Sequence, residues 1–291
     1  MRIDLHLGVH KTATTHLQRY WLTCGQVAGA TAVAPSLTEV RMHLTPVCNP
    51  PSVKSAGGDE AERRRQAATH WLQDWCSRAP ALVLSDENII GSSARLFAQR
   101  ALYANVSGRL QRLAEMLDGH EVRIWIAVRE YGAFLRSAYC EMLRHGPYRP
   151  FRQVYGPMDL ERRGWEHVVQ EIQQVFPAAR LVCWRYESLN DLRPSITAAL
   201  FGLKRAAMPP LDDRRDRQSL SQLAVELLDD IHRRVGAEEA TRVHASVERV
   251  VSGHGLAHFD PWTDAERSEF KERYERSLSA LQGLPGLSWL G

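Results

Sequence analysis

Apolar and polar residues alternate at the start of the chain. Residues 3–7 read Ile-Asp-Leu-His-Leu, with the apolar side chains at every second position, as in a half-buried β-strand. Gly8 ends this strand, a polar loop follows, and apolar residues at 17, 20 and 21 have helical spacing. The pattern predicts a strand, a loop and a helix start. The unpaired amides and the dipole of such a helix start suit a bound phosphate.

Strands and helices alternate along the next part of the chain. The predicted buried strands are residues 81–84, 122–128 and 181–184. The predicted amphipathic helices are residues 67–75, 106–117, 134–142 and 165–176. This alternation predicts an α/β fold, with a mostly parallel sheet flanked by helices on both faces in a P-loop-like, three-layer arrangement.

Two parts of the chain have a different pattern. Residues 25–60 are rich in proline and lack clear periodicity, which indicates a long loop that is exposed at 54–59. From about residue 192 the pattern is helical, and capping-box spacings at 219–222 and 263–266 each predict a helix start. We expect one domain over residues 1–291, with an α/β part at 1–205 and a helical C-terminal part at 206–291.

Composition narrows the class of protein. Of the 291 residues 44% are hydrophobic and 24% charged, and the net charge of +3 is too small to indicate nucleic-acid binding. The five cysteines are widely spaced and form no C-x-x-C pair, which argues against a disulfide framework or a zinc site. The N-terminus leads directly into a strand, and no apolar run reaches the roughly 20 residues of a transmembrane span. These features predict a cytoplasmic protein.

Polar residues follow four of the predicted strands. They are His10 with Lys11, the segment 85–87, Arg129, and Tyr186 with Glu187. Because ligands of parallel α/β sheets bind beyond the carboxyl ends of the strands, we expect these residues to converge. The first loop is not a Walker A motif, since only two residues separate Gly8 from Lys11 and no glycine precedes the lysine.

Two motifs resemble the sulfotransferases that use 3′-phosphoadenosine 5′-phosphosulfate (PAPS), including bacterial members with a P-loop-like fold. The loop Gly8-x-x-Lys-Thr-x-Thr-Thr-x-Leu-Gln18 is similar to their phosphosulfate-binding loop, which typically reads K-[ST]-G-T-T. Arg129 at a strand end and Ser137 on the following helix have the spacing of their clamp for the nucleotide 3′-phosphate. An arginine fork and a helical hydroxyl suit that group. The resemblance spans roughly residues 1–205.

The resemblance implies that PAPS is the donor, that adenosine 3′,5′-bisphosphate is the product, and that no metal is required. The implied nucleotide-binding residues are Gly8, Val9, His10, Lys11, Thr12, Ala13, Thr14, Thr15, Arg129, Ser137 and Tyr186. Tyr186 aligns with a tyrosine that contacts adenine in some cytosolic members. Ala13 departs from the family, which has glycine there, and we expect alanine to be acceptable if this residue is right-handed helical.

Three residues are candidates for the chemistry. Sulfuryl transfer resembles phosphoryl transfer, in which catalysis consists mostly of positioning and charge stabilisation, and Lys11 is predicted to meet the charge on the leaving oxygen. Glu87 is the predicted general base, because the carbohydrate sulfotransferases that the chain resembles have a catalytic glutamate at such a strand end. The structural alternative is a carboxylate that favours a helix start. His10 is the second candidate base, although a hydrogen bond that orients the loop is the favoured role.

The predicted function is sulfuryl transfer from PAPS to a hydroxyl of a saccharide, glycolipid or secondary metabolite, a small-molecule or carbohydrate acceptor. Two other hypotheses stay open: a P-loop kinase that uses ATP and magnesium, and a nucleotide-binding protein without catalysis. The sequence carries no signature of the acceptor or of the oligomeric state.

Overall fold

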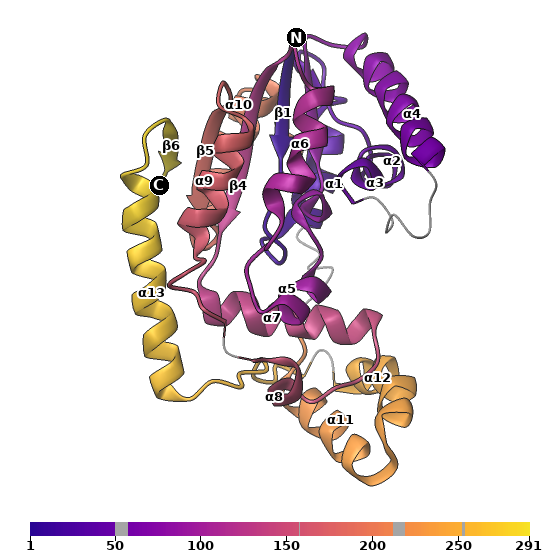
Figure 1. The fold of residues 1–291 in the computed structure, drawn as a ribbon, viewed down its shortest axis with the longest axis vertical. Coiled ribbons are helices and arrows are strands. Elements are labelled where there is room, and N and C mark those ends of the chain that lie inside the picture. The colour runs from indigo at the N-terminus through magenta and orange to yellow at the C-terminus, as the bar shows by residue number, and fades with distance from the viewer. Residues whose placement is uncertain (50–57, 157, 212–218, 252–253) are drawn as a thin grey trace.

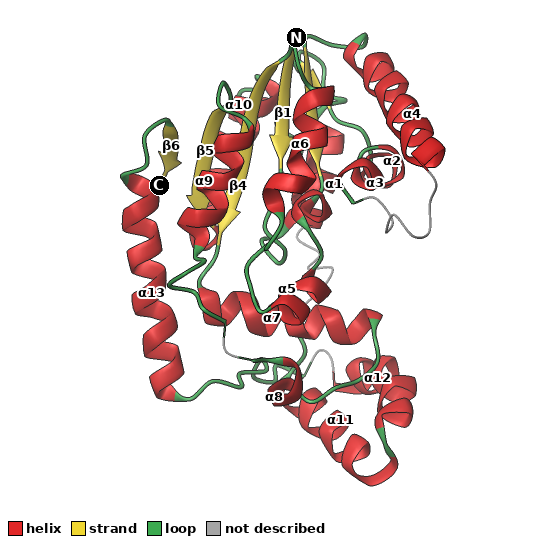
Figure 2. Ribbon diagram, viewed as in Figure 1, coloured by secondary structure: helices red, strands yellow, loops and turns green. Residues whose placement is uncertain are grey.

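The computed structural model describes residues 1–49, 58–156, 158–211, 219–251 and 254–291. These residues form one sheet of six parallel strands in the order β2-β3-β1-β4-β5-β6 (Figures 1 and 2). The strands are β1 (Arg2–His6), β2 (Ala32–Val33), β3 (Ala81–Ser85), β4 (Glu121–Val128), β5 (Arg180–Arg185) and β6 (Leu287–Leu290). Because all six strands are parallel, their carboxyl ends share one edge of the sheet.

Alternating side chains of the strands build a core on each face of the sheet. Ile3 and Leu5 of β1 belong to the core that includes α6 (Val106–Met116), α9 (Trp165–Val175) and α13 (Asp264–Gln282). Val83 of β3 and Trp184 of β5 belong to the opposite core, together with α1 (Thr14–Cys24) and α10 (Leu189–Phe201). The predicted α/β fold, a parallel sheet covered on both faces and followed by a helical C-terminal part, is confirmed.

Further helices surround this framework. They are α2 (Leu37–His43), α3 (Thr45–Cys48), α4 (Gly58–Cys76), α5 (Ser93–Gln99), α7 (Tyr131–His145), α8 (Phe151–Val154), α11 (Gln222–Val235) and α12 (Ala237–Val251), with 3-10 turns η1 (Glu87–Ile90), η2 (Tyr186–Ser188) and η3 (Arg205–Ala207). Helix α7 lies across the edge at which the strands end, and the pair α11–α12 lies beyond it (Figure 1). The sheet edge that should hold a ligand is therefore covered in part by α7.

Several short elements differ from the prediction. The expected loop at 25–60 contains β2, α2 and α3, and its residues 50–57 lie outside the described part of the chain. Ser36 and Glu39 form a capping box at the start of α2. The C-terminal part is not wholly helical, because β6 pairs with β5 and extends the sheet. Within the described residues, no helix combines the length and the apolar character needed to cross a bilayer.

The two predicted capping boxes have different outcomes. Thr263 and Glu266 cap each other at the start of α13, as predicted. The box expected at 219–222 is wrong, because Ser221 is the N-cap of α11 and its hydroxyl accepts a hydrogen bond from the Ala224 amide at 3.1 Å. Gln222 is thus the first helical residue.

A buried carboxylate ties β1 to β4 beneath the candidate loop. Asp4 is fully buried and accepts hydrogen bonds from Arg2 at 3.0 Å, from Arg123 at 2.6 Å and from the Trp125 indole at 2.8 Å. A buried charge is tolerated when it is paired and its oxygens are satisfied, and this one is. The contacts help to fix the register of the strand from which the loop emerges.

Candidate anion-binding and catalytic site

The loop between β1 and α1 bends through three residues with left-handed backbone. Gly8, Lys11 and Ala13 have φ angles of 46°, 65° and 59°. Thr12 stabilises the bend, because its hydroxyl and its amide donate to the carbonyl oxygen of Val9 at 2.6 and 3.3 Å. The backbone therefore curls into a compact turn directly before the helix.

Helix α1 begins without a side-chain cap. Its N-cap is Ala13, and its first hydrogen bond runs from the Leu17 amide to the Ala13 carbonyl at 3.0 Å. The amides of Thr14 and Thr15 therefore have no intrahelical acceptor. Gly8 allows the strand end to approach the Thr14 side chain, since a Cβ there would lie 2.8 Å from the Thr14 hydroxyl oxygen. An anion at this helix start would meet unpaired donors and the positive end of the dipole.

The conformation of Ala13 corrects the expectation drawn from the sequence. The residue is not right-handed helical: it lies in the left-handed region, outside the first turn of α1. An alanine in that region is strained by roughly 1–2 kcal/mol, whereas glycine adopts it freely. This geometry gives a physical reason for the glycine that the related loop motif has at the same place.

His10 is held by hydrogen bonds on both sides of its ring. Nδ1 lies 2.9 Å from the Tyr103 hydroxyl, which also accepts from the His10 amide at 3.1 Å, and Nε2 lies 3.3 Å from Oδ1 of Asn88. The amide oxygen of Asn88 can only accept, so this network assigns the proton to Nε2 and leaves Nδ1 to accept from Tyr103. Burial lowers the pKa of His10 despite nearby Glu87. His10 is thus a neutral, fully engaged imidazole.

Two carboxylates follow β3 and have different surroundings. Asp86 is fully buried and accepts from Thr45 at 2.6 Å, from Arg41 at 3.3 Å and from the Asn88 amide at 3.1 Å. Glu87 is partly exposed. One of its oxygens lies 3.0 Å from Arg41, and the other lies 3.4 Å from the side-chain nitrogen Nε2 of Gln18. Asp86 therefore holds the segment in place, while Glu87 keeps access to the site.

Lys11 and Glu141 form a half-buried ion pair above the loop. The ammonium nitrogen lies 3.2 Å from Oε2 of Glu141 on α7, and the two side chains are only 14% and 13% exposed. Glu141 stands one helical turn beyond Ser137, so both lie on the same face of α7. The helix across the sheet edge thus supplies the counter-charge for the loop lysine.

Arg129 joins the end of β4 to the loop. Its guanidinium donates to the carbonyl oxygen of Lys11 and lies 4.6 Å from the ring centre of Tyr186, which follows β5. Burial lowers the pKa of Arg129, although nearby Tyr186 and Glu187 oppose this. An arginine side chain is not deprotonated in proteins, so the group keeps its charge. Ser137 is buried on α7, where its hydroxyl lies 3.3 Å from that of Ser219.

The backbone around Arg129 is firmly held. Its carbonyl oxygen accepts from the Trp165 indole at 2.8 Å. The Glu130 side chain caps α7 through the amides of residues 132 and 133, each at 2.7 Å. Glu187 accepts from the Glu130 amide at 3.1 Å and from the Tyr274 hydroxyl at 3.0 Å. Rigid support of this kind keeps the Arg129 side chain in one geometry for contact with a ligand.

A buried histidine lies beneath the loop. His6 is fully buried, its Nδ1 lies 2.8 Å from the Ser85 hydroxyl, and its Nε2 has no hydrogen-bond partner among the described residues. Burial lowers the pKa of His6 to about 3. The ring packs edge-on against Trp21 and stacks on Trp184. His6 is thus a neutral packing residue under the strand end.

The predicted convergence of polar strand ends is observed. His10 reaches the segment after β3, and Arg129 connects the loop to Tyr186. Gln18, the last residue of the predicted loop motif, reaches the segment after β3. The sequence prediction missed three further partners: Arg41, Tyr103 and Glu141. Only Glu141 had a readable signal, its helical spacing from Ser137. No set of three His, Cys, Asp or Glu side chains in the described ranges is arranged to hold a metal ion.

Comparisons with known proteins find a likeness at the level of structure. No protein-family model matches the chain, and no significant match to a curated protein is found. The chain is similar in structure to a sulfotransferase from Alicyclobacillus acidocaldarius, with a TM-score of 0.45 and 17% sequence identity, covering 84% of this chain and 94% of that one. At this level of similarity the activity has to be argued from the chain's own residues.

Proposed function

We propose that the protein is a sulfotransferase that moves a sulfuryl group from PAPS to a hydroxyl acceptor. The observation that carries the proposal is the contact of Arg129 with the Lys11 carbonyl, because it joins two motifs that lie 118 positions apart. One motif offers unpaired amides and a lysine to an anion, and the other offers a charged group beside an aromatic ring. A 3′-phosphorylated adenine nucleotide with a 5′-phosphosulfate has the groups that match both.

Lys11 is proposed as the group that stabilises the leaving oxygen. Its ammonium is already confined by Glu141 at 3.2 Å, in a place with little solvent exposure. An incoming phosphosulfate would compete with Glu141 for that charge without a large rearrangement. A preorganised cation in a partly dry site acts more strongly than one in water.

Glu87 is proposed as the general base, and His10 as a positioning residue. One oxygen of Glu87 is paired with Arg41 at 3.0 Å, whereas the other makes only a 3.4 Å contact with the side chain of Gln18 and is the one that an acceptor hydroxyl would meet. The Nδ1 of His10 already accepts from Tyr103, so an acceptor hydroxyl would have to displace that bond. His10 instead fixes the loop against the segment that carries Glu87.

A magnesium-dependent kinase is the second candidate, and the contacts of Asp86 argue against it. Asp86 is the nearest equivalent of the carboxylate that follows an apolar strand in ATP-binding P-loop proteins. It is fully buried and its oxygens are occupied by Arg41, Thr45 and Asn88. Binding Mg²⁺ or its water shell there would require breaking these contacts.

The test is PAPS-dependent sulfation of a panel of hydroxyl compounds, including glycosides, glycolipids and phenols. Release of adenosine 3′,5′-bisphosphate and the mass of the product are measured together. We expect transfer to at least one acceptor class, and a loss of about 100-fold in turnover for Glu87→Gln, the size of a general-base effect. Binding of the bisphosphate without transfer to any acceptor would instead support a nucleotide-binding protein without catalysis.

A further inference from the structure

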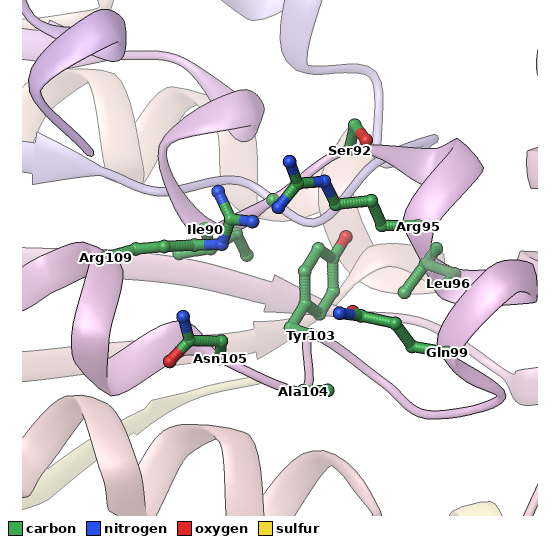
Figure 3. Close-up of a pocket in the computed structure, with 10 residues that line it drawn as sticks. Ile90, Ser92, Arg95, Leu96, Gln99, Tyr103, Ala104, Asn105 and Arg109 are labelled. Carbon is green, nitrogen blue, oxygen red and sulfur yellow. The ribbon is translucent and has the colours of Figure 1, made fainter. Parts of the chain in front are cut away.

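A small pocket lies beside the proposed site and contains two arginines. Its wall is formed by the end of η1, by one side of α5, and by the segment that leads into the start of α6 (Figure 3). Arg95 comes from α5 and Arg109 from α6, and their guanidinium groups point toward each other (Figure 3). The enclosed cavity is only about 10 Å³, about the space of one water molecule, and most of the 210 Å³ of empty space lies in its open mouth. A small group of a ligand would therefore sit at the mouth between the arginines, where a nucleotide has no room.

Arg109 is buried without a counter-charge. The residue is only 6% exposed, and among the described residues no carboxylate pairs with it and no acceptor takes its hydrogen bonds. Burial and the nearby charge of Arg95 lower its pKa, while the only opposing effect comes from Cys48. Buried charges in proteins are normally paired. The N–H groups of the Arg109 guanidinium therefore lack acceptors in a buried place, where unpaired donors destabilise the protein.

The contrast with the other arginines near the site is clear. Arg41, Arg144 and Arg163 each contact a carboxylate. Arg129 has no carboxylate in contact, but it donates to the Lys11 carbonyl oxygen, whereas Arg109 has neither kind of partner among the described residues. Two adjacent guanidiniums without an acid between them repel each other, and this repulsion disappears when an anion binds between them. The pair is thus suited to an oxyanion that the protein itself does not supply.

The pocket is built to keep this space open and is connected to the loop. Gly91 has φ of 138°, and a Cβ there would lie 3.3 Å from Tyr103 and 3.7 Å from the Arg109 side chain. Tyr103 lines the pocket with its ring, while its hydroxyl bonds to His10. Three residues separate Glu87 from Gly91, so η1 links the proposed base directly to the pocket wall.

We propose that the Arg95–Arg109 pocket binds an anionic group of the acceptor, a carboxylate, sulfate or phosphate carried by the molecule that is sulfated. The assignment rests on the proposed function, since it names the class of acceptor for the same site. Ser92, Gln99 and Asn105 also line the pocket and offer hydrogen bonds to the remaining oxygens. A hydroxyl near Glu87 and an anionic group between the arginines would belong to one substrate.

The first experiment tests the pocket without any turnover. Inorganic sulfate is titrated into the protein by calorimetry, with adenosine 3′,5′-bisphosphate present at saturation so that the nucleotide site is filled. We expect saturable binding that weakens about 10-fold or more in Arg95→Ala, because a charge-assisted bond to a bound anion is lost. Arg205→Ala removes an exposed arginine on η3 and should bind sulfate as the wild type does.

A charge reversal separates binding from folding. Arg95→Glu places a carboxylate beside Arg109, so it should abolish sulfate binding and raise the unfolding temperature at the same time. Absence of saturable sulfate binding in the wild type, or equal binding in Arg95→Ala, would overturn the assignment.

The second experiment decides where the anion comes from. Acceptors are compared in matched pairs, such as a glucuronide against the corresponding glucoside. We expect the anionic member to have the lower KM, and Arg95→Ala to raise that KM about 10-fold while turnover of the neutral member is unchanged. Sulfate binding without any preference for anionic acceptors would refute the acceptor assignment and indicate a site for a free anion. Sulfate binding that depends on Arg95, in a protein that transfers nothing from PAPS, would refute the proposed function alone.

Discussion

Ala13 offers a test in which the sign of a stability change decides the result. The residue is the N-cap of α1 and has φ of 59° and ψ of 24°. Replacing it with glycine removes the close contact between Cβ and the backbone that makes the left-handed region unfavourable, worth roughly 1–2 kcal/mol. The same change makes the unfolded chain more flexible, which costs about 0.4–1 kcal/mol. Ala13→Gly should therefore stabilise the protein by about 1 kcal/mol.

The assay is urea unfolding followed by tryptophan fluorescence, together with the thermal midpoint. A gain of about 1 kcal/mol in the free energy of unfolding raises the thermal midpoint by about 2–4 °C in domains of 150–250 residues, which are somewhat smaller than this one. Ala67→Gly is the matched control, because Ala67 is exposed in the middle of α4 and right-handed helical. Glycine there should destabilise the protein by about 1 kcal/mol. If both variants are destabilised equally, the left-handed conformation of Ala13 is wrong.

Three further predictions concern the site. Lys11→Ala should lower turnover by about 100-fold or more and weaken bisphosphate binding far less, because the lysine ammonium stabilises the charge that develops on the leaving oxygen during transfer. Equal, small effects on turnover and binding would show that Lys11 takes no part in the chemistry. Arg129→Lys should weaken adenosine 3′,5′-bisphosphate about 10-fold and adenosine 5′-phosphate little, as measured by calorimetry; an equal loss would argue against a contact with the 3′-phosphate. The pKa of His6 is lowered from 6.5 to about 3, so its contribution to stability should be full only well above pH 6.5 and should fall by about 2 kcal/mol by pH 5 in urea unfolding. His6→Asn should flatten this decline, and an unchanged slope would contradict the neutral buried state of His6.

The fold could be predicted where the pattern is strong and local. The strand at 122–128 is predicted as a buried run, and the structure places β4 there within one residue. β2 has two residues and β6 has four, so neither carries enough periodicity, and both depend on pairing with a neighbour already in the sheet. Helix α2 could have been found, because Ser36 and Glu39 have the spacing of a capping box within the proline-rich segment.

The site could be predicted in outline, because parallel strands bring their carboxyl ends together whatever the loops do. The loop lysine, the arginine after β4 and the acidic pair after β3 all lie at that edge. The partners of these groups could not be predicted. Glu141 meets Lys11 only because α7 crosses the sheet edge, and Arg41 meets Glu87 only because α2 packs beside it. Such contacts depend on how elements dock, which local sequence does not determine.

The most direct test of the account compares two nucleotides by calorimetry. Adenosine 3′,5′-bisphosphate is titrated into the protein with and without magnesium, and ATP with magnesium is titrated in parallel. If the protein uses PAPS, the bisphosphate should bind saturably and without dependence on magnesium, at least about 10-fold more tightly than ATP. Tight, magnesium-dependent binding of ATP with no binding of the bisphosphate would contradict the account.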